Sequence, residues 1–113
     1  MIVCALFCLT ALTAASPPAQ AQDTSADRFT NRDLLEQSDR DQRLWIFGVI
    51  VGASHGLGLR DTSAGECLAR WYFDDEEQVY ANIRVNLERY PDNEPTIIIL
   101  ALARRACPNL DAQ

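Results

Sequence analysis

The apolar run at residues 44–59 constrains the fold more than any other part of the sequence. It is 16 residues long, and Gly48, Gly52 and Gly56 recur in it four positions apart. Residues with this spacing share one face of an α-helix, so the three glycines would line a groove without side chains. Each glycine inside a helix costs about 1 kcal/mol relative to alanine, which close packing would have to offset. We therefore predict a long helix whose glycine face packs against another helix, within the fold or, as the alternative, from a partner.

A second interpretation of the same glycines is a nucleotide site. Gly52, Gly56 and Gly58 form a G-x-x-x-G-x-G pattern, which resembles the cofactor fingerprint of short-chain dehydrogenases. That fold needs several βαβ units of about 30 residues each. Its tyrosine–lysine pair is also missing, because the chain contains no lysine and Tyr80 is followed four positions later by Arg84. We exclude a dinucleotide enzyme and expect no cofactor.

The N-terminus has the features of a secretory signal peptide. Residues 2–15 are apolar, and Ala19 and Ala21 form an A-x-A cleavage pattern. The apolar core is shorter than the ~20 residues that span a bilayer. We expect residues 1–21 to be removed, with residues 22–29 as a flexible leader and residues 30–110 as the helical domain. The mature protein would be periplasmic or secreted, with no membrane association after cleavage.

The cysteines agree with an oxidising compartment. Cys4 and Cys8 would leave with the signal peptide, so Cys67 and Cys107 remain. Two cysteines in a small exported domain most simply form one disulfide. The chain has no C-x-x-C motif and a single histidine, so we expect no metal site.

Charge limits the class of partner. The net charge is −6, with 16 acidic residues and ten basic residues, all of them arginine. Binding to nucleic acid or to an anionic membrane needs clustered cations. A basic protein partner suits this balance, and a homodimer is also open.

We predict an all-α fold, a small bundle of about four helices stapled by one disulfide. The helices are expected at residues 30–37, from Ser38 or Asp39 through the glycine run, at 74–90 and at 95–105. In the second helix, Leu44, Phe47, Val51 and His55 would face inward. Residues 61–65 (DTSAG) are expected to form a loop that leads to Cys67. The last segment is apolar on all sides and should be central in the core, although a strand is an alternative there.

An ordered set of motifs resembles a known family. The set is Gly48-Val49-Ile50-Val51-Gly52, Cys67-Leu68-Ala69, Leu87-Glu88-Arg89-Tyr90-Pro91, and Ala101-Leu102 before Cys107-Pro108. It resembles the Rap/Tai proteins, periplasmic immunity proteins against type VI secretion amidases. Val49 and Ala69 replace an aromatic residue and a proline of the family pattern. The resemblance implies a non-catalytic inhibitor that binds a secreted peptidoglycan amidase effector.

Two regions are candidates for the contact surface. The first is residues 60–66, and the second is residues 70–77, where Trp71, Tyr72 and Phe73 adjoin four carboxylates. We expect one of these three aromatic side chains to project outward, and we name Trp71, Tyr72, Asp74 and Asp75 as the contact residues. Aromatic anchors beside steering charges are typical of protein-binding sites. The residues suggest no active site, because Ser54 and His55 are neighbours on a helix and would point to different faces. An alternative function is a periplasmic acid-stress chaperone of the HdeA kind.

Overall fold

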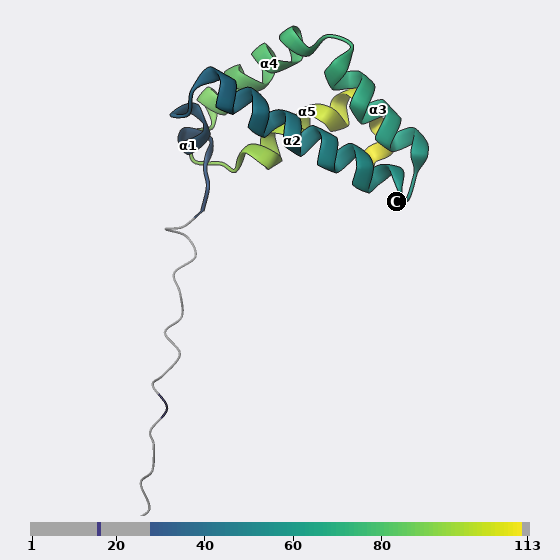
Figure 1. The fold of residues 1–113 in the computed structure, drawn as a ribbon, viewed down its shortest axis with the longest axis horizontal. Helices are drawn as coiled ribbons and strands as arrows, with labels where there is room; N and C mark the ends of the chain where they lie inside the picture. The colour runs from purple at the N-terminus through teal and green to yellow at the C-terminus, as the bar shows by residue number, and fades with distance from the viewer. Residues whose placement is uncertain (1–15, 17–27, 112–113) are drawn as a thin grey trace, which may run out of the picture.

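The computed structural model describes residue 16 and residues 28–111 (Figure 1). Its elements are α1 (Asn31–Leu35), α2 (Asp39–Gly58), α3 (Thr62–Phe73), α4 (Glu76–Arg89), α5 (Pro95–Ala106) and a 3-10 turn, η1 (Pro108–Asp111). The described residues contain no strand, so the all-α prediction is confirmed and the strand alternative at residues 96–105 is wrong. The predicted signal peptide and leader lie outside the described residues, apart from Ser16, Arg28 and Phe29.

Helices α2 and α3 form a hairpin that runs across the front of the molecule in Figure 1. Residues 61–65, predicted as a loop, are the N-cap and first turn of α3. The reason is the Asp61 carboxylate, which accepts hydrogen bonds from the backbone N–H groups of Ser63 (2.9 Å) and Ala64 (3.2 Å). This cap starts the helix despite the glycine at position 65.

The close contact between α2 and α3 uses a different glycine from those predicted. A β-carbon at Gly65 would lie 2.5 Å from the backbone oxygen of Ser54 and 2.8 Å from the backbone nitrogen of Gly58. At Gly48, Gly52 and Gly56 a β-carbon would meet nothing within 4 Å. These three glycines lie on the exposed side of α2, so their predicted packing within the fold is wrong. Their contact with a partner stays a prediction.

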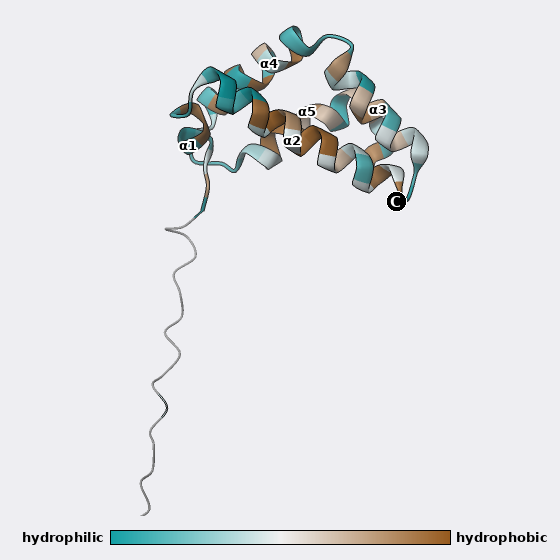
Figure 2. Cartoon of the chain, viewed as in Figure 1, coloured by the Kyte–Doolittle hydropathy of each residue, from teal (hydrophilic) through white to brown (hydrophobic). Residues whose placement is uncertain are grey.

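The inward face of α2 also differs from the prediction. Its buried residues are Gln42, Ile46, Ile50 and Ser54. Leu44 and Phe47 are 56% and 45% exposed, and His55 is exposed. The middle of α2 is brown on the side seen in Figure 2, and buried Ile46 and Ile50 make its inner side apolar too, so periodicity alone did not select a face. Gln42 determines which face of α2 turns inward. Its side-chain amide donates to the carbonyl oxygens of Leu35 (3.2 Å) and Gln37 (2.8 Å) and closes the α1–α2 turn.

The core lies where α2 and α3 face α4 and α5. Its fully buried large side chains include Leu34, Ile46, Ile50, Leu68, Tyr72, Ile83, Leu87 and Ile99. Helix α5 contributes a buried stripe of four residues, Ile98, Ile99, Leu102 and Ala103. The expectation that α5 is surrounded on all sides is wrong, because Ile97 is 54% exposed.

Cys67 and Cys107 form the predicted disulfide, with an S–S distance of 2.11 Å and a Cα–Cα distance of 6.0 Å. The bond joins the middle of α3 to the residue that follows α5. It therefore connects the hairpin to the C-terminal end of the domain.

Helix α1 docks on the α4–α5 loop. The Asn31 backbone N–H donates to the Asn93 oxygen (2.8 Å), and the Arg32 N–H donates to the Pro91 oxygen (3.0 Å). The Asn31 side-chain amide donates to the Tyr90 oxygen (2.7 Å). These bonds hold a five-residue helix that is too short to be stable alone.

Candidate functional site

The predicted contact residues meet at the corner between α3 and α4. Trp71, Asp74 and Asp75 line one cavity of about 410 Å³ together with Cys67, Arg70 and Ala106. Asp74 ends α3, and the Asp75 carboxylate accepts from the backbone N–H of Gln78 (3.4 Å) as the cap of α4. The structure thus brings three of the four predicted residues together beside the disulfide.

Tyr72 does not belong to this surface. Its side chain is fully buried, because it continues the stripe of Ala64 and Leu68 that faces the core. Burial raises the pKa of its hydroxyl, which has no hydrogen-bond partner among the described residues. The prediction that Tyr72 contacts a partner is wrong.

Phe73 is the aromatic residue that points outward, with 43% of its surface exposed. Its ring packs edge-on against that of Phe47 on α2, with centroids 5.8 Å apart. Leu44, which is more exposed still, lies one helical turn before Phe47. We call Leu44, Phe47 and Phe73 the apolar face. The expectation that one of the three aromatic residues at 71–73 projects outward holds for Phe73, but sequence reasoning missed the α2 part of this face because it placed Leu44 and Phe47 in the core.

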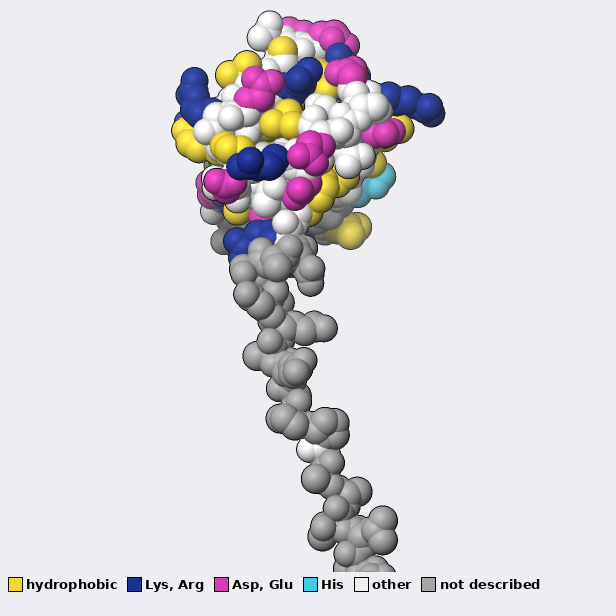
Figure 3. Space-filling model, turned by 90° about the vertical axis from the view of Figure 1, so that its left-hand side faces the viewer, with side chains coloured by type: hydrophobic (Ala, Val, Ile, Leu, Met, Phe, Trp, Pro, Cys, Tyr) yellow, Lys and Arg dark blue, Asp and Glu magenta, His cyan; other side chains and the backbone are white. Residues whose placement is uncertain are grey.

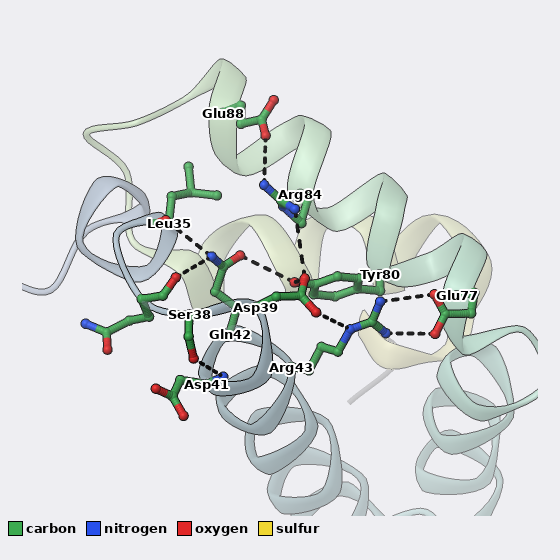
Figure 4. A network of polar contacts seen from close by, with 11 residues as sticks. Leu35, Ser38, Asp39, Asp41, Gln42, Arg43, Glu77, Tyr80, Arg84 and Glu88 are labelled. Atoms are coloured by element: carbon green, nitrogen blue, oxygen red, sulfur yellow. Dashed lines mark hydrogen bonds and ion pairs between the residues drawn. The ribbon is translucent and has the colours of Figure 1, made fainter.

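Carboxylates border the apolar face. Glu77 is held by Arg43, whose two terminal nitrogens donate to its two oxygens at 2.9 and 3.0 Å (Figure 4). Asp74 and Glu76 are exposed and form no ion pair within residues 28–111. The corner therefore presents negative charge next to exposed aromatic rings.

A polar network fixes the position of this corner. The buried Tyr80 hydroxyl donates to Asp39 (2.8 Å), and the Arg43 Nε donates to the same carboxylate (3.0 Å) (Figure 4). The Arg43 guanidinium also lies 3.9 Å from the centroid of the Tyr80 ring. Burial and the Asp39 carboxylate raise the pKa of Tyr80 to about 12, and the hydrogen bonds from Tyr80 and Arg43 lower the pKa of Asp39. The network joins the start of α2 to α4, and we interpret it as structural.

The second predicted region, residues 60–66, is the turn and first part of α3. A cavity of about 540 Å³ lies there, lined largely by small residues on both helices and by the 90% exposed Leu59. Ser54 is buried and His55 is exposed, so the two side chains point apart as expected. Asp61 is occupied by capping α3. These three residues do not form a catalytic arrangement.

The remaining surface is mixed in charge. At the end of the molecule formed by α1, basic, acidic and apolar side chains alternate (Figure 3). No cluster of three or more histidine, cysteine or carboxylate side chains that could hold a metal occurs among the described residues. None of the helices within residues 28–111 combines the length and hydropathy needed to cross a membrane.

Comparisons with models of protein families, with curated proteins and with solved structures find no match to this chain. The likeness to the immunity proteins therefore rests on the ordered sequence motifs described above.

Proposed function

We propose that this chain is a non-catalytic binding protein that acts after export and docks a basic protein partner at the α3–α4 corner. The observation that carries the proposal is the exposed Phe47–Phe73 pair beside Asp74 and Glu76. Aromatic anchors inside a charged rim are the usual composition of an energetically important interface patch.

The geometry supports a surface that needs little rearrangement on binding. Phe73 lies at the end of α3, two residues before the cap of α4. The disulfide at Cys67 and the Arg43–Glu77 pair restrain the two sides of this corner. A restrained patch loses little conformational freedom when it binds, which favours affinity. The exposed carboxylates would speed association with a basic surface.

We further propose that the partner is a secreted peptidoglycan amidase and that the protein is its immunity protein. This step depends on the family resemblance, whose motifs cover residues 48–108 in order. The family's role requires occlusion of an enzyme by a small rigid domain. A disulfide-linked helical domain with one aromatic, acidic patch suits that role.

The test uses the purified protein as bait in a periplasmic extract, followed by titration of the captured partner. Phe73→Ala should weaken binding at least tenfold, because it removes one of the two exposed rings. Ile97→Ala is the matched control, since Ile97 is similarly exposed but lies on α5. Added salt should slow association through screening of the carboxylates.

Equal affinities for the wild type and Phe73→Ala would place the contact surface elsewhere. Capture of a partner that is not an amidase would leave the binding face standing and refute the immunity role.

A further inference from the structure

A groove between α4 and α5 has the opposite chemistry to the acidic corner. Two adjoining cavities, of about 500 and 270 Å³, share Asn86, Arg89, Leu102 and Arg105 in their walls. Two further asparagines, at positions 82 and 93, and two aromatic residues, at 71 and 90, also line the combined groove. No carboxylate among the described residues lines either cavity.

The two arginines in the groove are among the five arginines that form no ion pair with a described residue. All ten arginines lie within residues 28–111, and five of them form ion pairs there: Arg28, Arg32, Arg43, Arg84 and Arg104. Arg89 and Arg105 form none with a described residue, although the chain has 16 acidic residues. The groove is therefore a local positive site on a protein of net charge −6.

A simpler explanation than ligand binding is that each arginine only stabilises the end of its own helix. Each lies in the last turn of its helix, where a cation interacts favourably with the helix dipole. That effect accounts for an arginine in the last turn of α4 and another in that of α5. It does not require the two guanidinium groups to line the same groove, nor that groove to exclude carboxylates.

From this arrangement we propose that the α4–α5 groove binds an acidic peptide segment. The planar guanidinium groups of Arg89 and Arg105 can each donate two parallel hydrogen bonds to one carboxylate. The amide of Asn86 already donates to the Asn82 backbone and side-chain oxygens (2.8 and 3.1 Å), so its own side-chain oxygen stays available to accept a peptide N–H. Val85 and Leu102 supply apolar contact for the peptide's neighbouring side chains. Amide, apolar and paired guanidinium groups together suit a peptide better than an inorganic anion.

The test is a titration of the purified protein with a blocked peptide of alternating glutamate and alanine. Side-chain NMR signals of Asn82, Asn86, Arg89 and Arg105 should shift saturably, and the glutamine version of the peptide should not bind. Arg89→Gln and Arg105→Gln should each weaken binding at least tenfold. Arg40→Gln is the matched control, because Arg40 is exposed and forms no ion pair within the described residues.

The acidic segment belongs to another protein. A shift of the groove signals with protein concentration alone, abolished by Asp74→Asn, would instead identify residues 74–77 of a second copy as the occupant and overturn the assignment to a separate partner. The groove proposal is independent of the proposed function, because Phe73→Ala should leave peptide affinity unchanged. No saturable shift with the glutamate peptide, or equal weakening by Arg40→Gln, would overturn it.

Discussion

Gly65→Ala tests the α2–α3 contact directly. The added β-carbon would lie 2.5, 2.8 and 2.9 Å from backbone atoms of Ser54 and Gly58. Backbone atoms of a packed helix cannot rotate away as a side chain can, so the two helices must separate. Overpacking of this kind costs roughly 1–3 kcal/mol. Alanine regains up to ~1 kcal/mol of helix propensity. We expect a net loss of about 1–2 kcal/mol in the free energy of unfolding.

Gly52→Ala is the matched control, because a β-carbon there meets nothing within 4 Å. It should stabilise the protein by up to ~1 kcal/mol through helix propensity alone. The two variants should then differ by about 2 kcal/mol, or roughly 8–16 °C in Tm for a domain of this size. Circular dichroism during heating, supported by urea titration, measures both. Equal Tm values for Gly65→Ala and the wild type would refute the close approach. A destabilised Gly52→Ala would show that this face packs against a partner.

Four further outcomes are expected. Alkylation under non-reducing conditions and intact mass should show no reactive thiol at Cys67 or Cys107, and reduction should lower the free energy of unfolding by roughly 4 kcal/mol. Tyr80→Phe should cost about 1 kcal/mol in urea titration, whereas Tyr72→Phe should be neutral or stabilising because it removes a buried hydroxyl with no described partner. The pKa of Tyr80 is raised from 10.0 to about 12, so its contribution to stability is complete below pH 10 and is lost as the pH rises towards 12; Tyr80→Phe should remove this loss. The pKa of Asp61 is lowered by hydroxyl and backbone hydrogen bonds, so its contribution is complete above about pH 4 and is lost as the pH falls further. Asp61→Asn should flatten that acid limb, and a steep limb in this variant would show that other carboxylates dominate.

The sequence was sufficient to predict a bond or a helix boundary where one physical signal dominated. With residues 1–21 predicted to be removed, two cysteines left one simple pairing, and the Cys67–Cys107 bond is present. Pro95 at the start and arginines in the last turn delimited α5 as expected. The caps of α2 and α4 were found within one residue, at Ser38 and Asp75.

The sequence was insufficient to predict the buried face or the element type where two signals competed. In α2, Leu44 and Ile46 are equally apolar, and only the inward hydrogen bonds of Gln42 distinguish their faces. The glycine of DTSAG suggested a loop, yet Asp61 caps a helix there, and the spacing of Leu68 and Tyr72 could have revealed it. The candidate site inherited both errors. Phe47 was assigned inward and Tyr72 outward, and the structure reverses them.

The docking of α1 has a consequence for the order in which the molecule is completed. Asn31 bonds to Tyr90, which lies 59 positions later in the chain. Helix α1, the first of the described helices to be synthesised, therefore lacks its contacts with the α4–α5 loop until almost the whole domain has emerged. The cysteine at position 107 appears later still, so neither the N-terminal clamp nor the covalent link can form until most of the domain has been made. A bulky group fused directly before Thr30 would hinder the clamp without preventing the disulfide. Such a fusion would yield an oxidised domain whose α4–α5 turn lacks its backbone partners.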